Sequence, residues 1–456
     1  MRTYVLDPAA KKPLYEQLYA AIKTDILSGV MTGGTRLPSK RALAEHLNIS
    51  CITVENAYAQ LLTEGYVISR PRSGYYVEQL DLLPQQQMAE QPKPIPPDVR
   101  PPAASAAQFP FSVWAKLMRG VLLDNRDQLL QPAPNTGLPA LRQAIAGMLR
   151  RSRGMEVSPE CIVIGAGAEY LYNILIQLLG REHIYGLEDP GHEKIRRVYE
   201  ANHVRIRPMK LDEFGVSLEA LTQSDVSVLH ISPGHQFPTG LVTPIGRRQQ
   251  LMTWLSQRPN RWIVEDDYDS EFRFSGRVIP SMYSMDTIGR VIYLNTFSKT
   301  ITPALRISYL ILPPALMEQY RQRLGFYSCT VPVFEQLALA KFLDDGYFEK
   351  HVSRMKRHYR ILRDQLLQRL RQSPRADAMT VQGAEAGLHF LLQLRTGLPD
   401  AELERQLTLA GVRAASLRRY EIVPQQNSGC LVIFYSDLAE ADLHRVVSCL
   451  EKLVDL

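Results

Sequence analysis

The sequence of 456 residues predicts a multi-domain fold: a small N-terminal α+β domain, a linker, and a large C-terminal α/β domain with a mostly parallel sheet. Two observations predict it. A proline-rich segment divides the chain, and beyond it apolar runs of strand length alternate with amphipathic helices. The hydrophobic content of 45% is that of an ordinary globular protein and excludes global disorder.

Composition also bears on location and partners. The sequence has no run of about 18 apolar residues, so no membrane span is expected. The N-terminus lacks the apolar core of a signal peptide. The five cysteines are scattered without CxxC spacing, which argues against disulfides and against a metal site. These features predict a cytoplasmic protein. The net charge of +6 does not by itself distinguish an enzyme from a DNA-binding protein.

Residues 79–108 are predicted to form the linker. The stretch from Leu82 to Pro102 holds seven prolines and three consecutive glutamines. Prolines at this density favour an extended, semi-rigid spacer. The alternative, a long surface loop within one domain, is disfavoured because structureless loops of about 20 residues are uncommon there. The linker separates a domain at residues 1–78 from one at residues 109–456.

The N-terminal domain is predicted to hold three short helices and a hairpin. Residues 13–29 carry apolar side chains at helical spacing. Ser39 and Ser50 are suited to cap two further helices. Residues 66–77 give two β-rich pieces joined by a turn at residues 72–74.

This order of elements is typical of a winged helix-turn-helix, whose third helix enters the major groove of DNA. Cations near the second helix and the hairpin, including Arg70, are expected to contact phosphates, which gives affinity with little sequence readout. A small helical interaction domain with a solvated basic face is the alternative. The candidate DNA-binding residues are Arg36, Ser39, Lys40, Arg41, Thr53, Arg72, Ser73 and Gly74.

The string GTRLPSKRALAEHLNISCITVENAYAQLLTEGYVISRPRSGYYV resembles the GntR-type winged-helix family over the whole domain. The resemblance implies that Arg41 and Thr53 face DNA and that residues 72–74 form the wing. One position departs from the family, which often has arginine where this chain has Cys51. A cysteine cannot make a bidentate contact to guanine, so no operator sequence follows from the resemblance.

In the C-terminal domain, five predicted strands each run into a polar or glycine-rich cluster. Functional side chains of α/β sheets gather at the carboxyl ends of strands, so these clusters are expected to meet. The predicted strands are Cys161–Ile164, His183–Leu187, Val226–Ile231, Trp262–Val264 and Val291–Leu294, and the clusters are residues 165–169, 188–192, 232–240, 265–268 and 295–299.

The clusters favour one ligand. Residues 165–169 place small residues before a helix, where free amides can hold a phosphate. Asp266 follows an apolar strand, where a carboxylate needs a partner such as a protonated ring nitrogen. Lys299 is a candidate Schiff-base nucleophile, and Ser298 and Arg306 are suited to phosphate. Each residue alone has an ordinary structural explanation, as a helix cap or a surface charge, but together they describe pyridoxal phosphate.

From about residue 109 onward the chain resembles fold-type-I aminotransferases, because GAGAE, EDPGH, HQFPTG, EDDYDSEF and NTFSKTITPALR occur in family order. HQFPTG with EDDYDSEF resembles the MocR-type regulators, which fuse a GntR-type winged helix to an aminotransferase-like domain. The resemblance implies that Lys299 forms the Schiff base, Asp266 pairs with the ring nitrogen and Tyr268 bonds the ring hydroxyl. It further implies the phosphate ligands Gly167, Ala168, Ser298 and Arg306, a stacking role for His192, and ring-lining roles for His235 and Gln236.

Two departures bear on catalysis. Residues 131–137 lack the tyrosine that the family carries there, and residues 430–435 lack an arginine for a substrate carboxylate. Arg413, Arg418 and Arg419 are nearby alternatives, each more simply explained as a surface charge. Efficient transamination is therefore in doubt, whereas cofactor binding is not.

The sequence therefore predicts a transcriptional regulator that binds DNA and senses pyridoxal phosphate, with an amine or amino acid as a further effector. A working aminotransferase with an accessory DNA-binding domain is the main alternative. A purely architectural DNA-binding protein is the third. The resemblance also implies a head-to-tail homodimer that binds repeated half-sites.

Overall fold

The computed structural model divides into two compact units, Met1–Asp98 and Val99–Leu456, which are described separately. The predicted linker at residues 79–108 lies almost wholly outside the described residues. Among the residues that the structure describes, no helix is long and apolar enough to cross a membrane. The structure describes residues 2–10, 12–79, 108–124, 126–274, 279–423 and 429–454.

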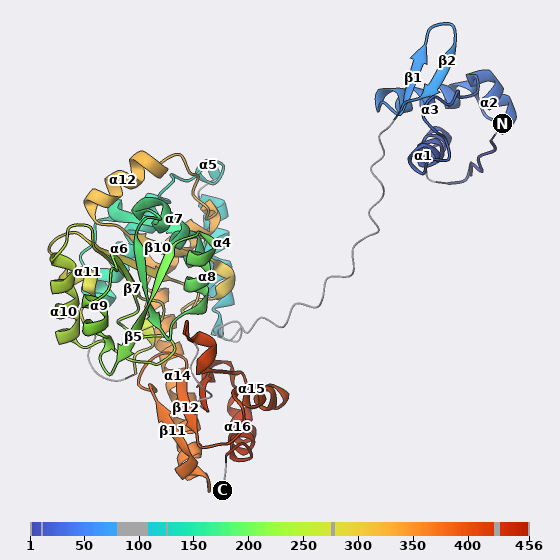
Figure 1. The fold of residues 1–456 in the computed structure, drawn as a ribbon. Coiled ribbons are helices and arrows are strands. Elements are labelled where there is room, and N and C mark those ends of the chain that lie inside the picture. The colour runs from blue at the N-terminus through green and yellow to red at the C-terminus, as the bar shows by residue number, and fades with distance from the viewer. Residues whose placement is uncertain are drawn as a thin grey trace. The chain divides into compact units, whose positions relative to one another are not determined.

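The small unit folds as three helices and a two-stranded hairpin (Figure 1). Apolar residues of α1 and α3 fill its core, among them Ile22 and Leu61, because they recur at helical spacing on one face of each helix. The strands pair antiparallel, with Val67 opposite Val77. The elements are α1 (Leu14–Leu27), α2 (Lys40–Leu47), α3 (Cys51–Thr63), β1 (Val67–Arg70) and β2 (Gly74–Val77).

Two serines cap helices of this unit, as the sequence predicts. The Ser39 hydroxyl oxygen accepts from the Ala42 amide at 3.1 Å. The Ser50 hydroxyl oxygen accepts from the Thr53 amide, also at 3.1 Å. Each bond satisfies one amide of a helix first turn that has no partner inside the helix.

The large unit is built around an eight-stranded sheet in the order β3-β10-β9-β8-β7-β4-β5-β6 (Figure 1). Strands β9, β8, β7, β4 and β5 run parallel, which confirms the mostly parallel sheet. β10 is antiparallel to β3 and β9. The strands are β3 (Ile162–Gly165), β4 (Ile184–Asp189), β5 (Arg205–Asp212), β6 (Gly215–Val216), β7 (Val228–Ile231), β8 (Trp262–Asp266), β9 (Val291–Thr296) and β10 (Ser308–Ile311).

Helices cover both faces of this sheet. Successive residues of a strand point to opposite faces, and both faces of these strands carry apolar side chains that must be buried. Val264 and Ile292 pack with α7, α8 and α12. Ile263 packs with α10 on the opposite side, and Tyr293 packs with α6 and α13. The helices are α4 (Phe111–Asp124), α5 (Arg126–Leu129), α6 (Pro139–Arg153), α7 (Ala168–Leu179), α8 (Glu193–Ala201), α9 (Leu218–Thr222), α10 (Ile245–Ser256), α11 (Met282–Met285), α12 (Pro314–Leu324) and α13 (Val333–Asp344).

A second, four-stranded antiparallel sheet follows near the C-terminus, in the order β11-β12-β14-β13. The long helix α14 leads to it from the large sheet (Figure 1). Its core joins Leu362 and Leu366 of α14 to Phe390 of β12. The elements are α14 (Tyr347–Gln372), β11 (Met379–Gln382), β12 (Phe390–Leu394), α15 (Asp400–Leu409), β13 (Ala414–Ser416), β14 (Cys430–Ile433) and α16 (Leu443–Glu451).

Candidate functional site

The two residues on which the cofactor hypothesis depends follow neighbouring parallel strands. Asp266 is the last residue of β8 and pairs in register with Leu294 of β9. Lys299 follows the end of β9 by three residues. The turns after both strands therefore emerge at the same edge of the sheet, where α/β folds place their ligands.

Asp266 is buried, and one of its oxygens has no partner. Its Oδ2 atom accepts from the Tyr172 hydroxyl at 2.5 Å and lies 3.4 Å from Nε2 of His230. Nδ1 of His230 lies 2.7 Å from the Tyr199 hydroxyl. The Oδ1 atom of Asp266 is buried without a hydrogen-bond partner. Because such an oxygen is costly unless paired, it fits a ligand that brings a buried N–H donor.

Lys299 has the properties of a nucleophilic amine. Burial lowers the pKa of Lys299 to about 8, because the charged ammonium form is disfavoured away from water. A larger fraction of the amine is therefore uncharged at neutral pH than for an exposed lysine. An uncharged amine can attack a carbonyl carbon.

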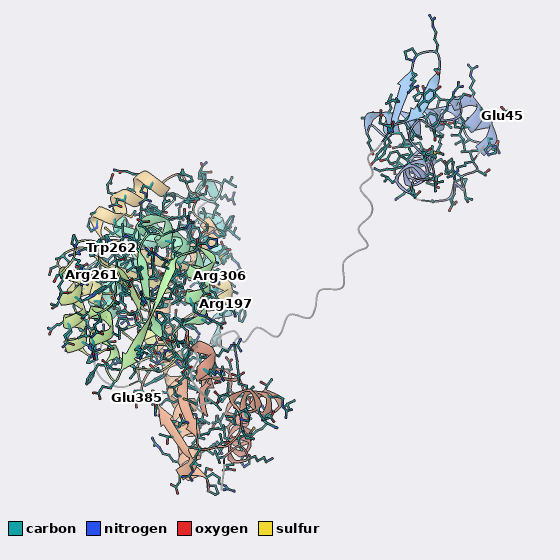
Figure 2. The ribbon with its side chains drawn as sticks, viewed as in Figure 1. Glu45, Arg197, Arg261, Trp262, Arg306 and Glu385 are labelled. Carbon is teal, nitrogen blue, oxygen red and sulfur yellow. The ribbon has the colours of Figure 1, made fainter. Side chains whose placement is uncertain are left out.

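A cradle for an anion lies at the start of α7. Gly167 precedes the helix with φ +94°, and a Cβ placed there would lie 2.3 Å from Nη2 of Arg306. Only glycine lets the guanidinium approach the helix N-terminus so closely. Arg306 lies beside a pocket of about 420 Å³ that Ala166 also lines, and Figure 2 labels it in the large unit.

A carboxylate already occupies part of this cradle. Glu169 accepts from Arg306 and from Lys194, each at 2.8 Å. Burial acts to raise the pKa of Glu169, but the bonds from Lys194, its own amide and Arg306 together lower it to about 2. The cradle thus holds a negative charge of the protein's own.

The rings of His192, Phe237 and Tyr268 lie close to one another. The imidazole of His192 lies 4.8 Å from the ring of Phe237, with an interplanar angle of 33°, and 6.4 Å from the ring of Tyr268. Burial lowers the pKa of His192 to about 4, so the imidazole is neutral at neutral pH. A neutral flat ring in this place is suited to stack on an aromatic ligand.

His235 is buried among acidic and aromatic neighbours. Its Nδ1 atom lies 2.9 Å from a carboxylate oxygen of Asp269 and 3.2 Å from the Tyr268 hydroxyl. His389 packs beside it, with ring centroids 5.0 Å apart. Among the described residues, His235, Asp269 and His389 are the one group of three whose ligand atoms lie close enough, within 4.8 Å, to hold a metal ion.

The side chains of two other predicted cofactor ligands, Gln236 and Ser298, make hydrogen bonds to other residues of the protein. The Gln236 amide donates to the Pro190 carbonyl at 2.9 Å and its oxygen accepts from Thr239. The Ser298 hydroxyl oxygen accepts from the Thr296 hydroxyl at 3.0 Å, and its proton stays available to a phosphate. Ala168 begins α7 and offers only its backbone.

The predicted DNA-binding residues lie on the small unit around α2, α3 and the hairpin. Arg41 is exposed and makes no ion pair with any described residue. Lys40 is paired with Glu55 of α3 at 2.6 Å. The Thr53 hydroxyl lies 2.8 Å from that of Ser50.

The wing is a tight, basic turn. Arg72 has φ +58° and Gly74 has φ +113°, and a Cβ on Gly74 would lie 3.7 Å from the Arg36 guanidinium. Ser73 and Tyr76 share a hydroxyl hydrogen bond of 2.6 Å. Arg36, Arg72 and Gly74 are therefore gathered on one small surface.

Sequence reasoning missed the residues that support Asp266 and His235. Tyr172 and His230 come from α7 and β7, and His389 directly precedes β12; all three are distant from Asp266 along the chain. One signal was available: His230 interrupts an otherwise apolar strand, where a polar side chain needs a partner. Tyr172 sits among other apolar residues of α7 and gives no such signal.

The family description "Bacterial regulatory proteins, gntR family" matches residues 14–77, and "Aminotransferase class I and II" matches residues 103–449. The chain is 38% identical over 455 residues to the uncharacterized HTH-type transcriptional regulator YhdI of Bacillus subtilis, covering 97% of this chain and 96% of YhdI. It is 34% identical to the probable rhizopine catabolism regulatory protein MocR of Rhizobium meliloti, covering 93% and 91%. The chain belongs to the MocR-type family of GntR-related transcriptional regulators.

A further regulator and two solved structures are also similar to this chain. The pyridoxine biosynthesis regulator PdxR of Corynebacterium glutamicum is 30% identical over 85% of this chain and 84% of its own. An archaeal alanine:glyoxylate aminotransferase superposes with a TM-score of 0.70, at 21% identity, over 77% of this chain and 88% of its own. The LysN α-aminoadipate aminotransferase of Thermus thermophilus gives 0.68, at 23% identity, over 77% and 90%. These structures show the aminotransferase fold of the large unit.

Proposed function

We propose that the large unit of this regulator, residues 109–456, binds pyridoxal phosphate and that the bound state changes the affinity of residues 1–78 for DNA. The observation that carries the proposal is the unpartnered, buried Oδ1 of Asp266, which lies at the same sheet edge as the low-pKa amine of Lys299. A protonated pyridine nitrogen is a donor that fits this oxygen. The glycine-lined cradle at α7 fits a phosphate.

We propose a role for each of the predicted cofactor-binding residues. Lys299 would hold the cofactor covalently, Asp266 would keep its ring nitrogen protonated, and Tyr268 would donate to its ring hydroxyl. His192 would cover one ring face, and Gly167, Ala168, Ser298 and Arg306 would hold the phosphate. His235 and Gln236 would enclose the ring from the other side. Bound pyridoxal phosphate supplies an aldehyde carbon that condenses reversibly with primary amines, which release water as the carbon–nitrogen bond forms.

This chemistry makes an amine or amino acid the natural second effector. Such a ligand would compete with Lys299 for the aldehyde carbon. Its binding would release the amine of Lys299 from the cofactor. A change in domain orientation would pass through the linker at residues 79–108 to the DNA-binding surface. That surface comprises Arg36, Ser39, Lys40, Arg41, Thr53, Arg72, Ser73 and Gly74.

A working aminotransferase is the second candidate, and the intact Lys299 and Asp266 favour it. The arginines that could hold a substrate carboxylate have other partners. Arg413 donates to Asp437 at 2.7 Å, and Arg419 lies 3.9 Å from Glu193. We therefore propose at most residual turnover. Steady conversion of an amino donor without any change in DNA binding would favour the enzyme.

We also propose that the protein forms a homodimer in the cytoplasm. Exposed apolar side chains occur on α4 and just after α5, and such side chains are candidates for a protein interface; they are Phe111, Leu122, Leu123 and Leu130. A head-to-tail homodimer through this region would present two winged helices to repeated half-sites. A regulator that binds chromosomal DNA works in the cytoplasm.

The direct test of cofactor binding is the visible absorption of the protein mixed with pyridoxal phosphate. The wild-type chain is expected to hold a visible band through dialysis, and Lys299→Ala to lose it because no amine remains at that position. Lys350→Ala, which changes an exposed lysine of α14, serves as the matched control and should keep the band. A band that survives in Lys299→Ala contradicts the attachment site.

A further inference from the structure

Two motifs of the large unit, residues 235–240 and 265–272, meet at a buried pair of side chains. Nδ1 of His235 lies 2.9 Å and 3.0 Å from the two carboxylate oxygens of Asp269. Only 3% of either residue is exposed. Because a buried carboxylate is costly unless a donor faces it, Nδ1 carries the proton and donates to Asp269.

This arrangement decides the direction of the Tyr268 hydroxyl. The hydroxyl oxygen lies 3.2 Å from the same Nδ1 atom. A protonated Nδ1 has no lone pair to accept from the phenol. The Tyr268 oxygen therefore accepts a share of this N–H, and its own hydrogen points elsewhere. Burial, reinforced by Asp269 and Asp266, raises the pKa of Tyr268 well above its ordinary value, so the hydroxyl keeps its hydrogen at neutral pH.

The packing fixes His235 in this position. Gly387 has φ +70°, and a Cβ placed on it would lie 1.9 Å from Cε1 of the imidazole. The backbone at Gly387 therefore lies directly against one side of the ring. His389 packs against the imidazole as well, with ring centroids 5.0 Å apart. These two contacts restrict the movement of the imidazole away from Asp269.

We propose that His235 and Asp269 are positioning residues that hold the Tyr268 hydroxyl as a donor toward the ring hydroxyl oxygen of pyridoxal phosphate. The inference rests on the proposed function, since Tyr268 can act on the cofactor only if this site binds it. In this role His235 and Asp269 act through Tyr268. Among the described residues, the other titratable side chains near Tyr268 and His235 include Glu188, His192, Asp266, Asp267, Lys299 and His389. Arg153, Arg248 and Glu265 line a pocket with His235 and Asp269.

A metal ion is the competing explanation for the same side chains. His235, Asp269 and His389 could offer it one ligand atom each. Metal binding through Nδ1 of His235 would replace the proton that this atom donates to Asp269. Adding Zn²⁺ or a chelator would then change the environment of Tyr268, whereas the positioning role predicts no effect of either.

The test is a double-mutant cycle on the pH titration of the cofactor's visible band. A hydrogen bond donated to the ring oxygen stabilises its anionic form, so losing the donor raises the titration midpoint. His235→Leu is expected to raise the midpoint by about one pH unit in the wild-type background. In a Tyr268→Phe background the same change should shift it by less than about a third of that, because the donor is already gone.

Two further variants keep the test decisive. His235→Gln retains an N–H donor for Asp269 and is expected to shift the midpoint less than His235→Leu. Asp269→Asn, if His235→Leu does not fold, should likewise change the midpoint only when Tyr268 is present. Equal shifts in both backgrounds, or a midpoint that responds to Zn²⁺, would overturn the positioning role. A wild-type chain without any visible band would instead contradict the proposed function.

Discussion

At the residue scale, the site depends on groups whose ordinary state is altered by burial. Lys299 is a lysine with its charge made costly, and Asp266 is a carboxylate with one oxygen left for a ligand. At the surface neither property would arise, because water would solvate the amine of Lys299 and the carboxylate of Asp266. Groups perturbed in this way and placed at one sheet edge are typical of a binding site.

The lowered pKa of Lys299 has a measurable consequence. Its uncharged fraction rises with pH and levels off above about 8, whereas an exposed lysine, with the ordinary value of 10.5, levels off above that higher pH. The rate at which pyridoxal phosphate attaches to the protein is therefore expected to reach its plateau more than one pH unit earlier than attachment to Nα-acetyl-lysine. Stopped-flow absorbance measures both rates. Identical pH profiles would show that Lys299 is not desolvated.

Glu169 gives a second prediction, because it bonds the same Arg306 that is suited to phosphate. Glu169→Gln removes the negative charge from the cradle and is expected to tighten pyridoxal phosphate binding about 3- to 10-fold. Binding of pyridoxal, which lacks the phosphate, should change little and serves as the control. Fluorescence titration gives both dissociation constants. Weaker phosphate-ester binding in the variant would show that Glu169 supports Arg306 rather than competing with its ligand.

The residues differ in how far the sequence predicts them. Asp266 and Lys299 occur at or just after the ends of apolar strands. The sequence itself therefore shows that these two charged groups are placed where burial is costly. Tyr172 and His389 reach the site from elements distant along the chain, and only the three-dimensional packing brings them there. The sequence does not reveal the hydrogen bond from the amide of the predicted ring-lining residue Gln236 to the Pro190 carbonyl, because it depends on how the loop satisfies its own backbone groups.

At the element scale, the parallel strands and the winged-helix elements could be predicted, because each has a clear periodicity or cap. The prediction of β3 differs by one residue from the observed Ile162–Gly165, since apolar runs define strand ends only loosely. Strand β10 and the four-stranded sheet were not predicted. β10 is short and follows a turn at Arg306, and its antiparallel pairing with β3 and β9 depends on contacts distant in sequence.

The exposed cations of the small unit give the prediction at this scale. Arg41→Ala is expected to weaken DNA binding and to lower the salt dependence of the binding constant by about one phosphate contact. Lys452→Ala changes an exposed cation of the large unit and should leave the salt dependence as it is. Binding titrations of a random-sequence duplex at several salt concentrations measure both. An unchanged slope for Arg41→Ala would contradict the assignment of this surface.

At the scale of the whole molecule, we propose that a small DNA-binding unit is coupled to a large unit that binds the cofactor. The net charge of +6 did not predict DNA binding; a few cations on one small surface do. Coupling between the units needs only a modest free energy, about 1 to 3 kcal/mol, to change DNA affinity 5- to 150-fold. Such coupling must be reciprocal, so DNA is expected to change the affinity of the protein for the cofactor by the same factor.

The most direct test of this central claim measures DNA affinity with and without pyridoxal phosphate. The full-length protein would first select its preferred duplex from a random pool, and dissociation constants for that duplex would be measured for wild type and for Lys299→Ala. The account predicts a change of at least about 5-fold on adding the cofactor to wild type, and a much smaller change in Lys299→Ala. A wild-type protein that binds the cofactor, as its visible band would report, but keeps the same DNA affinity would contradict the account.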